Sequence, residues 1–237
     1  MTEENKPEIK RGMVVVAHPD DAEFGCAGTV AKWASEGVEM YFVLCTDGSK
    51  GSSDPNMTPE ELVTIRRQEQ VEAARELGVK DVEFLGYPDA YVQHTLELRR
   101  DIARAIRKYK PDRVIAMAPH RSFNSGGYLN HPDHLAVGDA TLAAIYPTAR
   151  DRMTFPELLK EGYEPHKVRE VYITGTDTPD CWVDTTDTID KKIASLRKHF
   201  SQVGDRDFEK GVRERAAEVA EGHDMQYAEA FKLFELG

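Results

Sequence analysis

The sequence predicts an α/β fold in which a mostly parallel sheet is covered by helices on both faces. Short apolar runs that resemble buried strands alternate along the chain with segments of helical length and composition. The chain has 237 residues, which is long enough to bury one substantial core. We therefore expect a single domain over residues 12–237, preceded by a disordered tail over residues 1–11.

Five apolar runs are candidate strands. Residues 13–17 and 40–45 are short, continuous and rich in β-branched or aromatic side chains, which is typical of buried parallel strands. Residues 81–86, 112–118 and 170–175 repeat this pattern. Because segments of helical character separate them, we expect a Rossmann-like sheet flanked by helices on both faces, with ligands bound at the carboxyl ends of the strands.

The segments between these runs carry helix signals. The clearest starts at Thr58, an N-cap residue followed by a proline at the first helical position and by Glu61, which completes a capping box. This helix should extend to Leu77 and end at Gly78. The other helices are expected over residues 26–36, 94–109, 133–146, 187–200 and 207–236.

Composition narrows the class of protein. The formal net charge of −11 repels phosphate backbones, so nucleic acid is not expected as a partner. No apolar run reaches the roughly 20 residues of a membrane helix, so no membrane partner is expected either. The three cysteines are scattered and odd in number, which favours reduced thiols and a cytoplasmic protein. The first residues lack the apolar segment of a secretory signal.

The stretch "VVVAHPDDAEFG", residues 14–25, takes the first strand directly into a histidine, a proline and two aspartates. Proline and aspartate favour turns for ordinary backbone reasons, so these residues can be turn chemistry alone. The alternative is that His18, Asp20 and Asp21 belong to a metal site. Their position just beyond the carboxyl end of a predicted parallel strand favours the metal site.

A second cluster lies in "NHPDHLAVGD", where His131 and His134 stand three residues apart at a predicted helix start. It follows the fourth candidate strand and a loop, so it also belongs to the carboxyl edge of the sheet. A lone histidine at a loop–helix boundary is commonly a cap or a surface residue. Two His-Pro-Asp clusters at two strand ends are harder to explain in that way, and together they predict a functional site.

The two clusters contain the residues needed for metal-assisted hydrolysis. Catalytic zinc takes three protein ligands and leaves one position for water, and His18, Asp21 and His134 can supply such a set. Asp20 can then act as a general base, and His131 can protonate a leaving group. The same ligands would also accept iron, cobalt or manganese.

These motifs resemble the LmbE-like, or PIG-L-like, family of zinc-dependent N-deacetylases. The resemblance extends over most of the chain. It rests on "AHPDDAEFGCAGT", "HPDH", the R-x-x-E helix in "IRRQEQVEAARELG", the substrate-loop segment "FLGYPDAYV" and the C-terminal signature "VDTTDTIDKKIASLRKHFSQ".

The resemblance implies one zinc ion per chain, bound by His18, Asp21 and His134. It also implies Asp20 as the general base and His131 as the general acid or oxyanion stabiliser. The expected reaction is hydrolysis of a linear amide that removes the acetyl group from an N-acetylglucosamine-type sugar or glycoside, releasing acetate and a free amine. Family members are often multimeric, so a homo-oligomer is expected.

By the same resemblance, Arg66 and Asp89 are expected to contact substrate. Many family members read HPDDE, whereas here Glu23 stands one place later, as a partner of the ligands or as a charge at a helix N-terminus. For His199 we expect a structural or supporting role rather than ligation.

Two other functions use the same residues. One is a metal-dependent phosphoesterase, which needs more positive charge than this acidic chain offers in its loops. The other is a non-catalytic metal- or sugar-binding module. Such a module has no use for an acid and a base beside the metal, so the presence of Asp20 and His131 argues against it.

Overall fold

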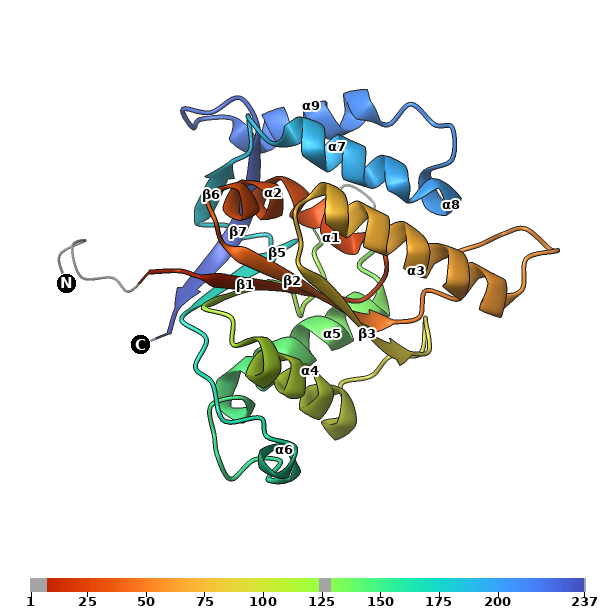
Figure 1. The fold of residues 1–237 in the computed structure, drawn as a ribbon. Coiled ribbons are helices and arrows are strands. Elements are labelled where there is room, and N and C mark those ends of the chain that lie inside the picture. Colours follow the sequence, from red (N-terminus) through yellow and green to blue (C-terminus); the bar gives the residue numbers. More distant parts are fainter. Residues whose placement is uncertain (1–7, 124–128, 237) are drawn as a thin grey trace.

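A computed structural model describes residues 8–123 and 129–236 of the chain. Its centre is a seven-stranded sheet in the order β3-β2-β1-β4-β5-β7-β6 (Figure 1). The strands are β1 (Arg11–Val16), β2 (Glu39–Thr46), β3 (Asp81–Tyr87), β4 (Arg113–Met117), β5 (Glu170–Thr174), β6 (Cys181–Asp184) and β7 (Ala228–Glu235). The first five pair in parallel, whereas β7 is antiparallel to both β5 and β6.

The central strands are buried because both faces of the sheet are covered. Val14 on β1 pairs with Phe42 on β2 and with Ile115 on β4, and none of these three side chains is exposed. Continuous apolar runs are what a doubly covered parallel strand requires. The prediction of a mostly parallel α/β sheet is confirmed.

Helices cover the two faces unequally. In Figure 1, α1, α2, α3, α7, α8 and α9 lie on one side of the sheet, and α4 and α5 lie on the other. The bounds are α1 (Asp21–Gly25), α2 (Ala27–Ser35), α3 (Pro59–Glu76), α4 (Leu96–Tyr109), α5 (Pro132–Ala143), the irregular segment η2 (Ala144–Thr148), α6 (Glu157–Lys160), α7 (Ile189–Lys198), α8 (Phe200–Val203) and α9 (Glu209–Ala220).

Helix α3 begins as predicted. The Glu61 N–H donates to the Thr58 hydroxyl at 3.3 Å, and the Glu61 carboxylate accepts the Thr58 N–H at 3.0 Å. This reciprocal capping box fixes the first turn of the helix, whose buried face packs against α7 beside the carboxyl edge of the sheet.

The prediction of a helix over residues 207–236 is wrong in its second half. Helix α9 ends at Ala220, and the chain returns as β7 between β5 and β6. Phe231, which is fully buried, pairs with Thr174 on one side and Cys181 on the other. Strand β6 was not predicted. The charged composition of this stretch favours a helix locally, but pairing at the edge of the sheet decides the structure.

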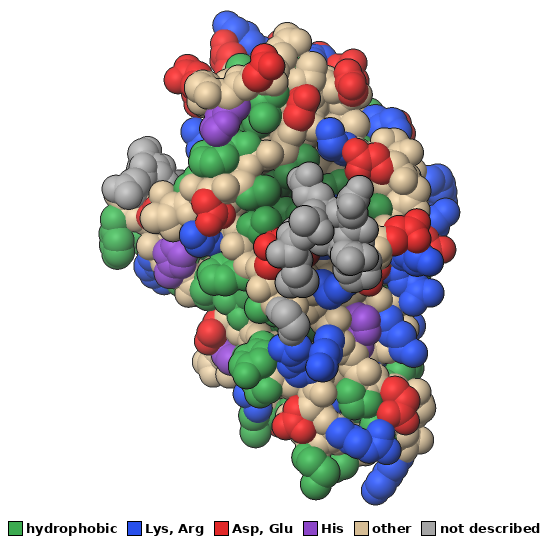
Figure 2. Space-filling view, turned by 90° about the vertical axis from the view of Figure 1, so that its left-hand side faces the viewer, with side chains coloured by type: hydrophobic (Ala, Val, Ile, Leu, Met, Phe, Trp, Pro, Cys, Tyr) green, Lys and Arg blue, Asp and Glu red, His purple; other side chains and the backbone are tan. Residues whose placement is uncertain are grey.

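Of the tail expected over residues 1–11, residues 1–7 lie outside the described part of the chain, and β1 already includes Arg11. Among the described residues, no helix combines the length and apolar character needed to cross a membrane. On the face drawn in Figure 2, acidic and basic side chains are interspersed.

Candidate metal centre and active site

The two His-Pro-Asp clusters meet at the carboxyl edge of the sheet. His18 and Asp21 follow β1 directly, whereas His134 lies in the first turn of α5, which β4 reaches through a loop. β1 and β4 are hydrogen-bonded neighbours, so their carboxyl ends deliver both clusters to one place.

Three side chains form a compact set of possible ligands. His18 Nδ1 lies 3.3 Å from His134 Nε2 and 3.3 Å from Asp21 Oδ2, and His134 Nε2 lies 3.1 Å from Asp21 Oδ1. Ligand atoms about 2.0–2.2 Å from a tetrahedral ion stand about 3.3–3.6 Å apart. The donor types and their spacing therefore fit a divalent metal ion.

The described residues offer two further overlapping groups that could hold a metal, in each of which the ligand atoms lie within 4.8 Å of one another. They are His18 with His131 and His134, and His18 with Asp89 and Asp133. His18 belongs to all three sets, so it is the centre of the cluster.

The two ring nitrogens of His18 face different partners. Nδ1 faces Asp21 and His134, whereas Nε2 lies 3.0 Å from Asp89 Oδ1 and 3.2 Å from Asp133 Oδ2. A ligating histidine usually donates its other ring N–H to a carboxylate, which fixes the tautomer and the ring plane. Asp133 suits that role because it is fully buried and its Oδ2 is itself held by the Ala90 N–H at 2.8 Å.

The surrounding carboxylates determine the pKa of His18. Burial lowers its pKa, but hydrogen bonds to Asp133, Asp21 and Asp89 outweigh burial and raise the pKa to about 12. Burial alone would raise the pKa of Asp21, but hydrogen bonds from His134 and His18 hold it well below its usual range. Without a metal ion, the cluster therefore holds an imidazolium among carboxylates.

Asp20 lies beside this cluster but takes no part in the triangle of ligand atoms. Its backbone is left-handed, with φ of 98°, a conformation that aspartate adopts more readily than most residues. Its carboxylate Oδ2 lies 3.3 Å from Arg66 Nη2. Burial and the neighbouring Asp21 charge raise its pKa to about 7, against the opposing effect of Arg66.

His131 is the N-cap residue of α5. Its Nδ1 accepts the Asp133 N–H at 3.2 Å, so the neutral ring carries its proton on Nε2. Burial, and then the charge of His18, lower the pKa of His131. A neutral ring with a fixed Nε2–H can donate a hydrogen bond to a bound ligand.

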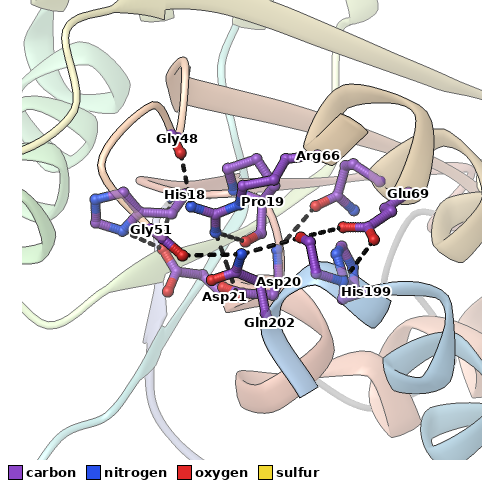
Figure 3. Close-up of polar contacts among 12 residues, drawn as sticks. His18, Pro19, Asp20, Asp21, Gly48, Gly51, Arg66, Glu69, His199 and Gln202 are labelled. Carbon is purple, nitrogen blue, oxygen red and sulfur yellow. Dashed lines mark hydrogen bonds and ion pairs between the residues drawn. The ribbon is translucent and has the colours of Figure 1, made fainter. Parts of the chain in front are cut away.

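Arg66 and Asp89 line the same small cavity of about 220 Å³ as His18, Asp20 and His131. Arg66 is only 3% exposed, and it donates to the carbonyl oxygens of Gly48 at 2.9 Å and Pro19 at 2.6 Å (Figure 3). Asp89 accepts the backbone N–H of Lys50 at 2.9 Å. Both expected substrate residues thus border the cavity while also holding the loops around it.

Neither Gln70 nor Asp133 was assigned a role in the site from the sequence. Gln70 is fully buried, and its Oε1 accepts the Asp20 N–H at 3.0 Å. Its spacing of four residues from Arg66 places both on one face of α3, a signal that was available in the sequence. Glu23 and His199 are also fully buried, with Glu23 Oε2 3.3 Å from His199 Nε2, away from the ligand triangle.

Comparisons with known proteins find relatives over most of the chain. Residues 13–145 match the family described as PIG-L: GlcNAc-PI de-N-acetylase. A diacetylchitobiose deacetylase of Thermococcus kodakarensis is 31% identical over 84% of this chain and 73% of its own length. A probable N-acetyl-alpha-D-glucosaminyl L-malate deacetylase of Bacillus anthracis is 29% identical over 85% of this chain and 88% of its own.

Solved structures give the same result. An N,N'-diacetylchitobiose deacetylase from Pyrococcus horikoshii, in complex with an inhibitor, superposes with a TM-score of 0.88 at 31% identity, covering 96% of this chain and 85% of that one. A hydratase from Pseudomonas putida superposes with a TM-score of 0.78 at 21% identity, covering 97% of this chain and 98% of that one. At that identity the likeness concerns the fold alone.

Proposed function

This chain belongs to the PIG-L family of de-N-acetylases and is an enzyme that removes N-acetyl groups, and we propose that it hydrolyses the acetamide of an N-acetylglucosamine-type sugar or glycoside with the help of one zinc ion. The products are acetate and the free amine. One observation carries the metal assignment: His18 Nδ1 and His134 Nε2 stand 3.3 Å apart, and each lies 3.1–3.3 Å from a carboxylate oxygen of Asp21.

The choice among the three overlapping sets follows from which histidines each carboxylate faces. Asp21 lies 3.3 Å from His18 Nδ1 and 3.1 Å from His134 Nε2. Asp89 and Asp133 instead face His18 Nε2, and they accept the backbone N–H groups of Lys50 and Ala90. They suit the support of a ligand better than ligation itself. Zinc held by the His18 triangle would polarise the acetamide carbonyl and lower the pKa of a water molecule.

In this proposal the chain's own residues handle the protons. Asp20 accepts a proton from the attacking water, because it lines one cavity with His18 and His131 and is not a ligand itself. Its neighbour Arg66 orients that carboxylate through the 3.3 Å contact. His131 donates from Nε2 to the oxygen that becomes negatively charged, and Asp20 passes the proton taken from the water to the nitrogen, so that the amine can leave.

Arg66 and Asp89 are proposed to contact the sugar at the cavity wall that they share with Asp20 and His131. Their groups suit sugar hydroxyls, since a guanidinium only donates hydrogen bonds and a carboxylate only accepts them. Two of the relatives are named as a diacetylchitobiose deacetylase and a probable N-acetyl-alpha-D-glucosaminyl L-malate deacetylase, and these names support this substrate class.

The test is acetate release from N-acetylglucosamine and N,N'-diacetylchitobiose by protein stripped with a chelator and reloaded with zinc. Release that returns at one equivalent of zinc supports the proposal. Hydrolysis of a phosphate ester without acetate release would favour the phosphoesterase. Zinc binding with neither activity would favour a binding module.

We further propose that the protein is cytoplasmic and forms a homo-oligomer. Cys26, Cys45 and Cys181 are all free thiols, and burial raises the pKa of each, which suits a reducing compartment. The oligomer rests on the family resemblance and is checked by light scattering on the purified protein.

A further inference from the structure

The peptide unit between Pro19 and Asp20 is held at both of its polar atoms by one helix. Arg66 Nη2 donates to the Pro19 carbonyl oxygen at 2.6 Å, and Gln70 Oε1 accepts the Asp20 N–H at 3.0 Å. The two side chains stand one turn apart on α3, so they reach the peptide from the same helix face.

The backbone angle φ of Asp20 is the rotation about its N–Cα bond. The Pro19–Asp20 peptide is held on one side of that bond, and the Asp20 carbonyl oxygen on the other side accepts the Phe24 N–H at 3.0 Å, so φ is held in place. The angle is 98°, in the left-handed region, which an aspartate leaves readily for more favourable conformations unless contacts prevent it. Asp20 is also the N-cap residue of α1, yet its side chain makes no capping hydrogen bond, so the carboxylate remains free to face the cavity.

A second contact fixes which end of the Gln70 amide faces Asp20. Gln70 Nε2 donates to Glu23 Oε1 at 2.8 Å, and a carboxylate can only accept at that position. The amide oxygen must therefore point at the Asp20 N–H. Gln70 and Glu23 are both fully buried, as is His199 behind them, so water does not compete for these bonds.

We propose that Gln70 is a positioning residue for catalysis. Gln70 sets the direction of the Asp20 carboxylate through the Pro19–Asp20 peptide, and Glu23 in turn orients Gln70. The inference rests on the proposed role of Asp20 as the base. It also explains why Glu23, displaced by one place from the usual HPDDE pattern, is buried next to α3. Gln70 touches none of His18, Asp21 and His134 through the bonds that hold it.

The test compares Gln70→Met, which keeps the side-chain volume but removes both hydrogen bonds, with Gln68→Met as the control. Gln68 lies on the same helix, is exposed, and bonds only Glu72 among the described contacts. For Gln70→Met we expect kcat for acetate release to fall about ten- to hundredfold, since a small misplacement of a catalytic group has that effect. KM and zinc stoichiometry should stay close to those of the parent, as should all parameters of the control.

A double-mutant cycle with Asp20→Asn separates positioning from general damage. If Gln70 acts through the Asp20 carboxylate, adding Gln70→Met to Asp20→Asn costs little further activity. An equal loss of kcat in both backgrounds would overturn the inference, as would unchanged kcat in Gln70→Met or a loss that follows zinc content. Full activity of Asp20→Asn alone would instead remove the base assigned under the proposed function.

An exchange variant keeps the inference testable if Gln70→Met folds poorly. In Gln70→Glu/Glu23→Gln the new carboxylate at position 70 can accept the Asp20 N–H in the original direction. It can also accept an N–H of the new amide at position 23, so this second bond is kept with donor and acceptor exchanged. We expect the exchange to recover most of the activity that Gln70→Glu alone loses. Failure of the exchange to recover activity, in a protein that melts at the parent temperature, would count against the inference.

Discussion

Glu229 on β7 joins three elements that are far apart in the sequence. Its carboxylate accepts the Gly28 N–H at 3.0 Å and the Thr29 N–H at 2.7 Å, and it pairs with Lys192 Nζ at 2.6 Å. It therefore caps the start of α2, whose own N-cap residue, Cys26, makes no side-chain capping bond. A carboxylate at this position also interacts favourably with the helix dipole.

Replacing Glu229 with alanine should lower the free energy of unfolding by about 4–5 kcal/mol. Leaving one member of a buried ion pair without its partner costs about 3–5 kcal/mol, and Lys192 is only 7% exposed. Loss of the helix cap adds about 1 kcal/mol. Lys192 keeps a bond to the Phe24 carbonyl oxygen at 2.9 Å, which places the total in the lower half of the combined range.

Urea unfolding, followed by circular dichroism, measures this change. The matched control is Glu214→Ala on α9, since Glu214 forms an exposed pair with Lys210 and should cost no more than about 0.5 kcal/mol. A loss below 1 kcal/mol for Glu229→Ala would refute the reasoning, because it would mean that the capping bonds and the buried pair contribute almost nothing.

Three further predictions concern the site and the packing that supports it. Asp20→Asn should lower kcat for acetate release about 10²–10⁴-fold, while metal analysis still finds one bound zinc ion. Loss of the zinc ion together with activity would contradict the assignment of Asp20 as the general base. Metal-free His18, with its pKa raised to about 12, must lose a proton to bind zinc. Zinc affinity measured by chelator competition should therefore rise about tenfold per pH unit between pH 7 and 9. A plateau above pH 7 would indicate an ordinary histidine. Gly138→Ala, whose added Cβ would stand 2.5 Å from the Met117 carbonyl oxygen, should cost about 1–3 kcal/mol in urea unfolding. Gly211→Ala, with no heavy atom within 4 Å, should instead stabilise the protein by about 1 kcal/mol, and the same sign for both would contradict the packing argument.

Local signals explain why much of the fold was predictable. The capping box at Thr58 and Glu61 acts over three residues, and the apolar run of β1 reports its own burial. The position of His18 beyond a parallel strand predicted where a site would lie, because all such strands end at one edge of the sheet. Each of these inferences needed only neighbours in the sequence or a general rule of α/β architecture.

The parts that were missed depend on contacts between distant residues. Strand β7 is held by β5 and β6 on either side, and Glu229 meets Gly28 across 201 positions of the chain. Gln70 meets Asp20 across 50 positions. Such pairs leave no periodic signal in a single sequence, and the charged composition near β7 pointed to a helix.

The central claim is that His18, Asp21 and His134 hold the metal ion. A crystal of the zinc-loaded protein, measured at the zinc absorption edge, tests it directly. The account predicts one anomalous peak about 2.0–2.2 Å from His18 Nδ1, His134 Nε2 and a carboxylate oxygen of Asp21. A peak on the other side of the His18 ring, between Nε2, Asp89 and Asp133, would contradict it.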